Sequence, residues 1–261
     1  MIAKLIKYDL IKTSRTLKYL YAITLGIAVL TRIINLFNYI FAFYIVGLIL
    51  AGCTYSMIAN ALINTIIHVL RNFMSDFYGD RSYLIHTLPV SKNQLFTAKY
   101  LTSLILLVAS LVISIGSLAL VLLTPELASS LNTLLASEIP GFDIQAWVFV
   151  IIFAIIIIVQ ICAYMSFGFF AVIKANTYNR KRVGMGFLWF GITYAVSMFG
   201  IMLFTIIVTA IFGDVAQIFA DKLDSHTLKL VFISISIAYV IEMIICVYLS
   251  NKTFNKGVNV D

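Results

Sequence analysis

Residues 146–173 read AWVFVIIFAIIIIVQICAYMSFGFFAVI, and this stretch decides the fold because it contains no charged side chain. An α-helix rises about 1.5 Å per residue, so about 20 apolar residues cross the roughly 30 Å of hydrocarbon in a bilayer. Five further runs are similarly apolar and long enough to cross. The predicted transmembrane helices cover residues 19–37, 40–68, 95–123, 146–173, 184–212 and 228–250.

The composition of the whole chain agrees with this pattern. Of its 261 residues, 62% are hydrophobic and only 11% are charged, and the mean hydropathy is +1.05. Soluble domains hold about half apolar and about a quarter charged residues. We therefore predict an all-α integral membrane protein with six transmembrane helices. Because no internal repeat, low-complexity tract or linker interrupts the chain, residues 1–261 are expected to form one transmembrane domain.

The lysines and arginines predict how the chain crosses the membrane, because cytoplasmic segments carry the excess of these residues. With six alternating spans, fifteen of the 18 basic residues fall on one side, in the N-terminal arm, residues 71–99, residues 174–182 and the C-terminal tail. Both termini are therefore expected in the cytoplasm. The net charge of +7 is scattered over these short segments, which favours anionic lipid over nucleic acid as its counter-charge.

Residues 1–18 predict an amphipathic helix on the cytoplasmic surface of the membrane. One arc of a helical wheel carries the apolar residues Ile2, Leu5, Ile6, Leu10 and Leu17. The rest of the wheel carries the basic residues Lys4, Lys7, Lys12, Arg15 and Lys18. This division is typical of helices that lie in the membrane interface. Asp9 interrupts the apolar arc, so contact of this face with a partner protein is the alternative.

Two loops on the opposite, outer side predict short helices at the outer leaflet. In the first, Thr124 is a predicted cap, Pro125 takes the first helical position, and Pro140 ends a helix in which leucines repeat at helical spacing. A similar pattern runs from Val215 to Leu223 in the second. Both helices are expected to cover the bundle as lids, and the alternative is that they shape an exit gate.

The longest polar interruption on the cytoplasmic side is RNFMSDFYGDRSYLIHTLPVSKNQ, residues 71–94. It ends in a predicted helix start, where Ser91 as N-cap and Gln94 three residues later form a capping box. Pro89 holds the chain just before this cap in an extended conformation. A segment joined so directly to the first turn of a membrane helix is suited to transmit motion to that helix.

The sequence lacks several common catalytic and nucleotide-binding motifs. It contains no G-x-x-x-x-G-K-[ST] phosphate loop, no H-E-x-x-H pair and no G-x-S-x-G elbow. Its three histidines are far apart, and its three cysteines lie in apolar runs without a C-x-x-C pair. We therefore expect no catalytic residue, no metal site and no disulfide, and we do not expect the chain to be an enzyme.

Glu242 is the one acidic residue well inside a predicted span. An unpaired charge near the bilayer centre costs on the order of 3 kcal/mol on insertion scales. Lys99 enters the third span from the cytoplasmic side and is expected at a comparable depth, so we predict that Lys99 and Glu242 form an intramembrane ion pair. The alternative is that Glu242 binds a proton or a cation, as in a secondary transporter.

The run YLIHTLPVSKNQL, residues 83–95, resembles the Leu-Pro-Val-Ser region of bacterial ABC transporter permeases of the type-two exporter family. The residues that carry the motif and the following helix start are Leu88, Pro89, Ser91 and Gln94. The chain is similar to small six-span subunits that export amphipathic peptides such as phenol-soluble modulins, or that confer resistance to peptide antibiotics. As topology, the resemblance covers the whole chain.

In such permeases the segment between spans two and three holds a coupling helix that docks into a groove on a separate ATPase subunit. The resemblance implies that the contact residues here are Phe73, Asp76, Phe77, Tyr78, Asp80 and Arg81. Phe73 and Phe77 are one turn apart and would present an aromatic knob to the partner. The family often has an acidic residue where Arg81 stands, and Asp80 beside it would take that place. The alternative is a solvated loop whose aromatic residues rest on the lipid interface.

The resemblance further implies a permease of the bacterial cytoplasmic membrane, expected as a homodimer with two ATPase chains. ATP and Mg²⁺ would bind to the ATPase, and this chain would bind no cofactor. Closure of the ATPases would press on the coupling segments and open a path for an amphipathic peptide or a lipophilic antimicrobial compound. Two other functions stay open: a proton- or cation-coupled transporter that uses Glu242, and a non-transporting adaptor or immunity protein that sequesters a peptide in the bilayer.

Overall fold

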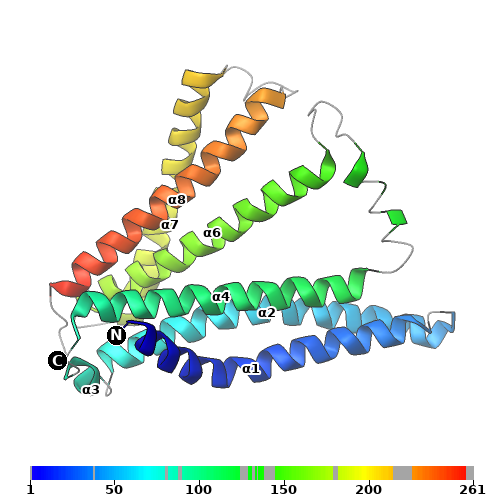
Figure 1. Cartoon of the computed structure of the whole chain (residues 1–261), viewed down its shortest axis with the longest axis horizontal. Helices are drawn as coiled ribbons and strands as arrows, with labels where there is room; N and C mark the ends of the chain where they lie inside the picture. The colour runs from blue at the N-terminus through cyan, green and yellow to red at the C-terminus, as the bar shows by residue number, and fades with distance from the viewer. Residues whose placement is uncertain are drawn as a thin grey trace. The chain divides into compact units, whose positions relative to one another are not determined.

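The computed structural model describes residues 2–37, 39–79, 82–87, 90–123, 129, 130, 133, 135–137, 145–178, 182–213 and 225–256. Its helices, labelled as in Figure 1, are α1 (Ile2–Asn35), α2 (Phe41–Tyr78), α3 (Ser82–His86), α4 (Lys92–Leu122), α6 (Ala146–Ala175), α7 (Arg182–Phe212) and α8 (Ser225–Asn255). Within these ranges, the six helices other than α3 are long and apolar enough to cross a membrane. An all-helical chain of this kind indicates a multi-pass membrane protein, because a helix satisfies its own backbone hydrogen bonds in lipid.

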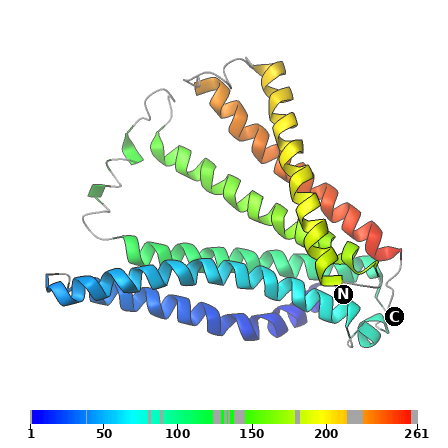
Figure 2. The same ribbon diagram turned by 180° about the vertical axis from the view of Figure 1, so that it is seen from behind.

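The helices form two compact units, Met1–Ala128 and Ser129–Asp261. In the first unit, α1, α2 and α4 lie side by side in both views of the ribbon (Figures 1 and 2). In the second unit, α6, α7 and α8 all pack against one another. Each unit therefore has its own set of helix contacts and its own candidate site.

A ladder of polar side chains joins α1 to α2. The hydroxyl oxygens of Thr31 and Thr54 are 2.9 Å apart, and those of Tyr21 and Thr65 are 2.8 Å apart. The later residue of α1 pairs with the earlier residue of α2, so the two helices form an antiparallel hairpin. All four side chains are buried. Hydrogen bonds between hydroxyl groups stabilise helix pairs in lipid, where burial of apolar surface does not favour association.

The N-terminal arm differs from its prediction. Instead of a separate interfacial helix over residues 1–18, α1 runs unbroken from Ile2 to Asn35 and bends within its first part (Figure 1). No proline or glycine precedes Gly26, so nothing in the backbone ends the helix between the arm and the span. Thr13 and Leu17 are buried just before the predicted junction, so this part of the helix also packs within the first unit.

The other five predicted spans each coincide with one helix, to within one residue where the prediction extends further. The main difference is at α2, which continues from the predicted end at residue 68 to Tyr78 and so contains the first third of the polar segment 71–94. The predicted outer-leaflet helices fall mostly outside the described residues. Of residues 124–140, the described positions 129, 130, 133, 135 and 136 are helical.

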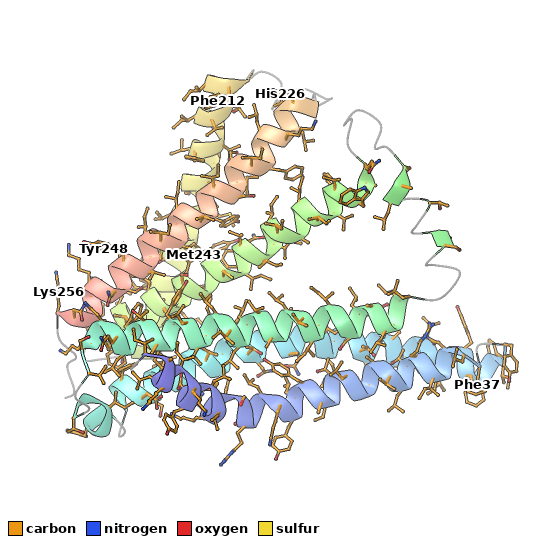
Figure 3. All side chains as sticks on the ribbon, viewed as in Figure 1. Phe37, Phe212, His226, Met243, Tyr248 and Lys256 are labelled. Carbon is orange, nitrogen blue, oxygen red and sulfur yellow. The ribbon has the colours of Figure 1, made fainter. Side chains whose placement is uncertain are left out.

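Aromatic and small side chains form the core of the second unit. The buried cluster contains Ala163, Phe167, Ile201, Ala238, Tyr239 and Cys246. Beside it, the Gln160 amide on α6 donates to the hydroxyl of Tyr239 on α8 at 3.0 Å and to the hydroxyl of Tyr164 at 2.7 Å. A polar contact across an apolar interface thus fixes α6 against α8. Figure 3 shows Met243 and Tyr248 on α8, where Glu242 immediately precedes Met243.

Candidate functional site

Four charged side chains from three helices meet in the first unit. Asp9 and Lys12 lie on α1, Asp76 lies in the last turn of α2, and Lys99 lies near the start of α4. The spacing of three residues between Asp9 and Lys12 places both on one face of α1. The positions of Asp76 and Lys99, on either side of the polar connection between α2 and α4, bring the ends of these two helices to the same cluster.

The ion pairs of this cluster are connected through Asp76. The Lys99 ammonium lies 2.5 Å from Asp76 Oδ2, and the Lys12 ammonium lies 2.6 Å from Asp76 Oδ1. Lys99 also pairs with Asp9. Two carboxylates and two ammonium groups therefore balance each other, and both oxygens of Asp76 have a cationic donor.

Burial decides which of these pairs contributes most to stability. The side chain of Asp76 is only 2% exposed and that of Lys99 15%, whereas Lys12 is 39% exposed. Removing one partner of a buried pair costs about 3–5 kcal/mol because the other charge is left uncompensated, while an exposed pair contributes about 1 kcal/mol or less. Lys99 is therefore the central cation of the cluster, and Lys12 is secondary.

A cavity of about 420 Å³ lies against this cluster. Besides the four charged residues, its wall contains Leu5, Tyr8, Phe77, Ile85, Leu95 and Ala98. Ile85 belongs to α3, the short helix within the polar segment. The wall of this cavity is thus formed by α1, the end of α2, α3 and the start of α4. A displacement of α3 would therefore change the surroundings of the charged cluster.

The predicted coupling residues at the end of α2 are mostly buried. The exposed fractions are 1% for Phe73, 2% for Asp76 and 0% for Phe77. The ring of Phe73 lies 4.8 Å from that of Phe77 and 6.4 Å from that of Phe96 on α4, measured between centroids. These rings pack between α2 and α4 and are not exposed as an aromatic knob for a partner.

The remaining predicted contact residues have different environments. Tyr78 is partly buried, while Asp80, Arg81, Leu88 and Pro89 lie outside the described residues. Tyr83 on α3, which is not among the predicted contact residues, has a side chain that is 69% exposed. Exposure of one large aromatic side chain on a short polar-side helix could not be inferred from spacing alone.

The N-cap of α4 agrees with its prediction. Ser91 is the N-cap, and its hydroxyl accepts a hydrogen bond from the backbone N–H of Gln94 at 3.4 Å. The Ser91 carbonyl accepts from the N–H of Leu95 at 3.1 Å, and Leu95 is buried. The polar segment therefore enters α4 through a defined cap.

The predicted ion pair between Lys99 and Glu242 joins residues of different units and stays a prediction. Within its own unit each side chain already has a partner. Lys99 pairs with Asp76 and Asp9, and Glu242 accepts a hydrogen bond of 2.5 Å from the Ser197 hydroxyl on α7. Asp9 is the feature of the sequence that points to the pairing with Lys99, because a carboxylate in the middle of an apolar arc needs a cationic partner when it is partly buried.

In the part of the chain that the structure describes, no three histidine, cysteine, aspartate or glutamate side chains gather as metal ligands would. Cys53, Cys162 and Cys246 are free thiols. The candidate site of the first unit thus consists of paired charges beside a cavity. Such a site can connect helices mechanically or bind a partner.

Comparison with known proteins adds no family to this description. No protein-family model, no curated protein and no solved structure matches the chain.

Proposed function

We propose that the chain is the membrane-spanning permease subunit of an ATP-driven ABC exporter, which moves amphipathic peptides or lipophilic antimicrobial compounds out of a bacterial cell. The ATPase would be a separate subunit, in keeping with the absence of a phosphate loop from the sequence. The resemblance of residues 83–95 to the Leu-Pro-Val-Ser region of type-two exporter permeases supports this assignment.

The observation that carries the proposal is the ion pair between Asp76 and Lys99, which lie on either side of the connection between α2 and α4. The pair binds the last turn of α2 to the start of α4, and Asp9 adds α1 to the same cluster. A force applied to the segment between these helices would therefore act on three membrane helices at once. This is the mechanical property that a coupling segment needs, because the ATPase acts on the permease only by contact.

The burial of Phe73 and Phe77 moves the proposed ATPase contact to α3. Tyr83 offers a large exposed side chain there, and aromatic residues are frequent anchors of protein interfaces. Phe73 and Phe77 would then support the contact from behind by holding α2 against α4. In this proposal the chain pairs with a second copy of itself above two ATPase chains.

The test is affinity purification of the tagged chain from its native membranes in mild detergent, followed by measurement of ATP hydrolysis and identification of the bound ATPase. Tyr83→Asp is expected to remove the ATPase, since a charge at the centre of an apolar contact is strongly unfavourable. Tyr39→Asp is the matched control, because Tyr39 is a tyrosine of similar exposure, 79%, in the turn between α1 and α2 and outside the predicted spans. Retention of the ATPase by Tyr83→Asp, or its absence from the wild-type preparation, would refute the assignment.

A second candidate function has one observation in its favour. Glu242 lines a cavity in the second unit, as the coupling site of a proton- or cation-driven transporter would. The two functions differ in their energy source. Uptake of a labelled substrate into inverted vesicles is expected to require ATP in the proposed exporter, whereas a response to an imposed pH gradient without ATP would favour the secondary transporter.

A further inference from the structure

The second unit contains a cavity of about 460 Å³ between α6, α7 and α8. Its wall is almost entirely apolar, and four of its side chains are aromatic, namely Phe167, Phe170, Trp189 and Phe204. Its polar side chains are Thr193, Ser197 and Glu242, and the last two contact each other. The cavity thus combines a carboxylate with a largely aromatic wall.

Glu242 has its hydrogen bond from Ser197 but no cationic partner among the described residues. Its other oxygen, Oε1, faces Gly200 on α7, where a Cβ atom would lie only 3.2 Å away. The lack of a side chain at Gly200 therefore leaves this oxygen uncovered on that side. A carboxylate in such a place favours a positive charge beside it, because opposite charges attract strongly where water is scarce.

The carboxylate lies at the middle of the cavity. On α7, its partner Ser197 comes eight residues after Trp189 and seven before Phe204, so apolar wall extends about 12 Å to one side and about 10 Å to the other. At the Trp189 end, the Lys174 ammonium lies 5.3 Å from the centroid of the indole ring. Because a resident cation already occupies that ring, an incoming positive charge is expected at Glu242.

We propose that this cavity binds a lipophilic monocation whose charge is flanked by apolar groups, such as a quaternary ammonium or a tetra-aryl phosphonium ion. Aromatic faces attract such cations, and the carboxylate supplies the counter-charge at mid-cavity. A strongly hydrated metal ion would need several further oxygen ligands, which Ser197 and Glu242 do not provide. This site names one substrate class for the proposed exporter, and its transport role, though not its binding, rests on that proposed function.

The test is equilibrium binding of tetraphenylphosphonium to the purified full-length chain in lipid nanodiscs, with no ATPase and no nucleotide present. Saturable binding is expected, and Glu242→Gln is expected to weaken it by at least about tenfold, the size of a lost charge contact of about 1.4 kcal/mol. Glu242→Asp keeps the charge and is expected to retain more of the affinity than Glu242→Gln.

A second variant tests the contribution of the cavity to binding independently of the charge. Val196 lines the cavity but is 65% exposed, so Val196→Trp is expected to fill the entrance and weaken binding without disturbing the core. Absence of saturable binding in the wild-type chain, or equal affinity of Glu242→Gln and wild type, would overturn the proposal. Because the assay contains no ATPase, binding can be demonstrated even if no ATPase associates with the chain, and it can fail even if one does.

Discussion

The Lys99 ammonium lies 2.5 Å from Asp76 Oδ2, so one ion pair joins the last turn of α2 to the start of α4. The two partners are 23 positions apart in the sequence, and the connection between α2 and α4 lies between them. Lys12 and Asp9 of α1 complete the cluster. Together these ion pairs hold α1, α2 and α4 to one another.

Lys99→Met is expected to destabilise the protein by about 3–5 kcal/mol, because Asp9 would lose its cation and the buried Asp76 would keep only Lys12, which is 39% exposed. The measurement is the free energy of unfolding in detergent micelles. Lys12→Met is the matched control, since Lys12 is 39% exposed and its loss is expected to cost about 1 kcal/mol or less. Equal losses for the two variants would contradict the central role of Lys99.

The partner of Lys99 can be identified by double-mutant cycles. Lys99→Met combined with Asp76→Asn is expected to show a coupling free energy of about 0.5–3 kcal/mol, as residues in direct contact do. The same cycle with Glu242→Gln measures the ion pair that the sequence analysis predicts. Additive effects in that second cycle would exclude a pair between Lys99 and Glu242, whereas coupling as large as that with Asp76 would establish it.

The apolar runs predict the number and approximate limits of the long helices because each run must meet one simple requirement, the thickness of the bilayer. The sequence is less informative about which helices become neighbours. Lys99 illustrates this, since its depth could be inferred from its place in a span, but the identity of its partner depends on the packing of α1 against α4.

The aromatic residues at the end of α2 show a second reason why the sequence does not reveal all contacts between helices. Phe73 and Phe77 share a helix face because they are four residues apart, and that spacing fits a surface contact as well as a core. The deciding fact is the proximity of Phe96 on α4, which arises only when α2 and α4 fold back on each other. The capping of α4 by Ser91 was predictable because it depends on neighbours within three residues.

Thr31→Val is expected to destabilise the hairpin of α1 and α2 by about 0.6 kcal/mol, the average for an inter-helix hydrogen bond in membrane proteins. Valine keeps the shape of threonine but cannot bond to the Thr54 hydroxyl, which lies 2.9 Å away. Thr16→Val is the control at an exposed position of the same helix. The free energy of unfolding of both variants is measured, and a loss of the same size at Thr16 would argue against the hydroxyl ladder.

Phe77→Ala is expected to cost about 3–5 kcal/mol of stability, since the ring is fully buried and its removal leaves a cavity. Tyr83→Ala is expected to change stability by about 0.5 kcal/mol or less, because Tyr83 is exposed. Thermal unfolding of the purified variants checks both values. A severe loss of stability in Tyr83→Ala would mean that its side chain supports the fold, and loss of ATPase from a Tyr83 variant would then not report on docking.

Ser91→Ala is expected to destabilise the start of α4 by about 0.5–1 kcal/mol, because the N–H of Gln94 would lose its acceptor. The hydrogen bond is long, at 3.4 Å, so the effect should fall in the lower part of the range for N-caps. Ser91→Asp provides the control, since aspartate caps helices as well as serine does and adds a favourable negative charge at the helix N-terminus. Hydrogen exchange of the first amides of α4 is the direct measurement. Faster exchange is expected in the alanine variant, and unchanged or slower exchange in the aspartate variant. Identical exchange in all three proteins would show that the packing of Leu95, and not the cap, holds the start of α4.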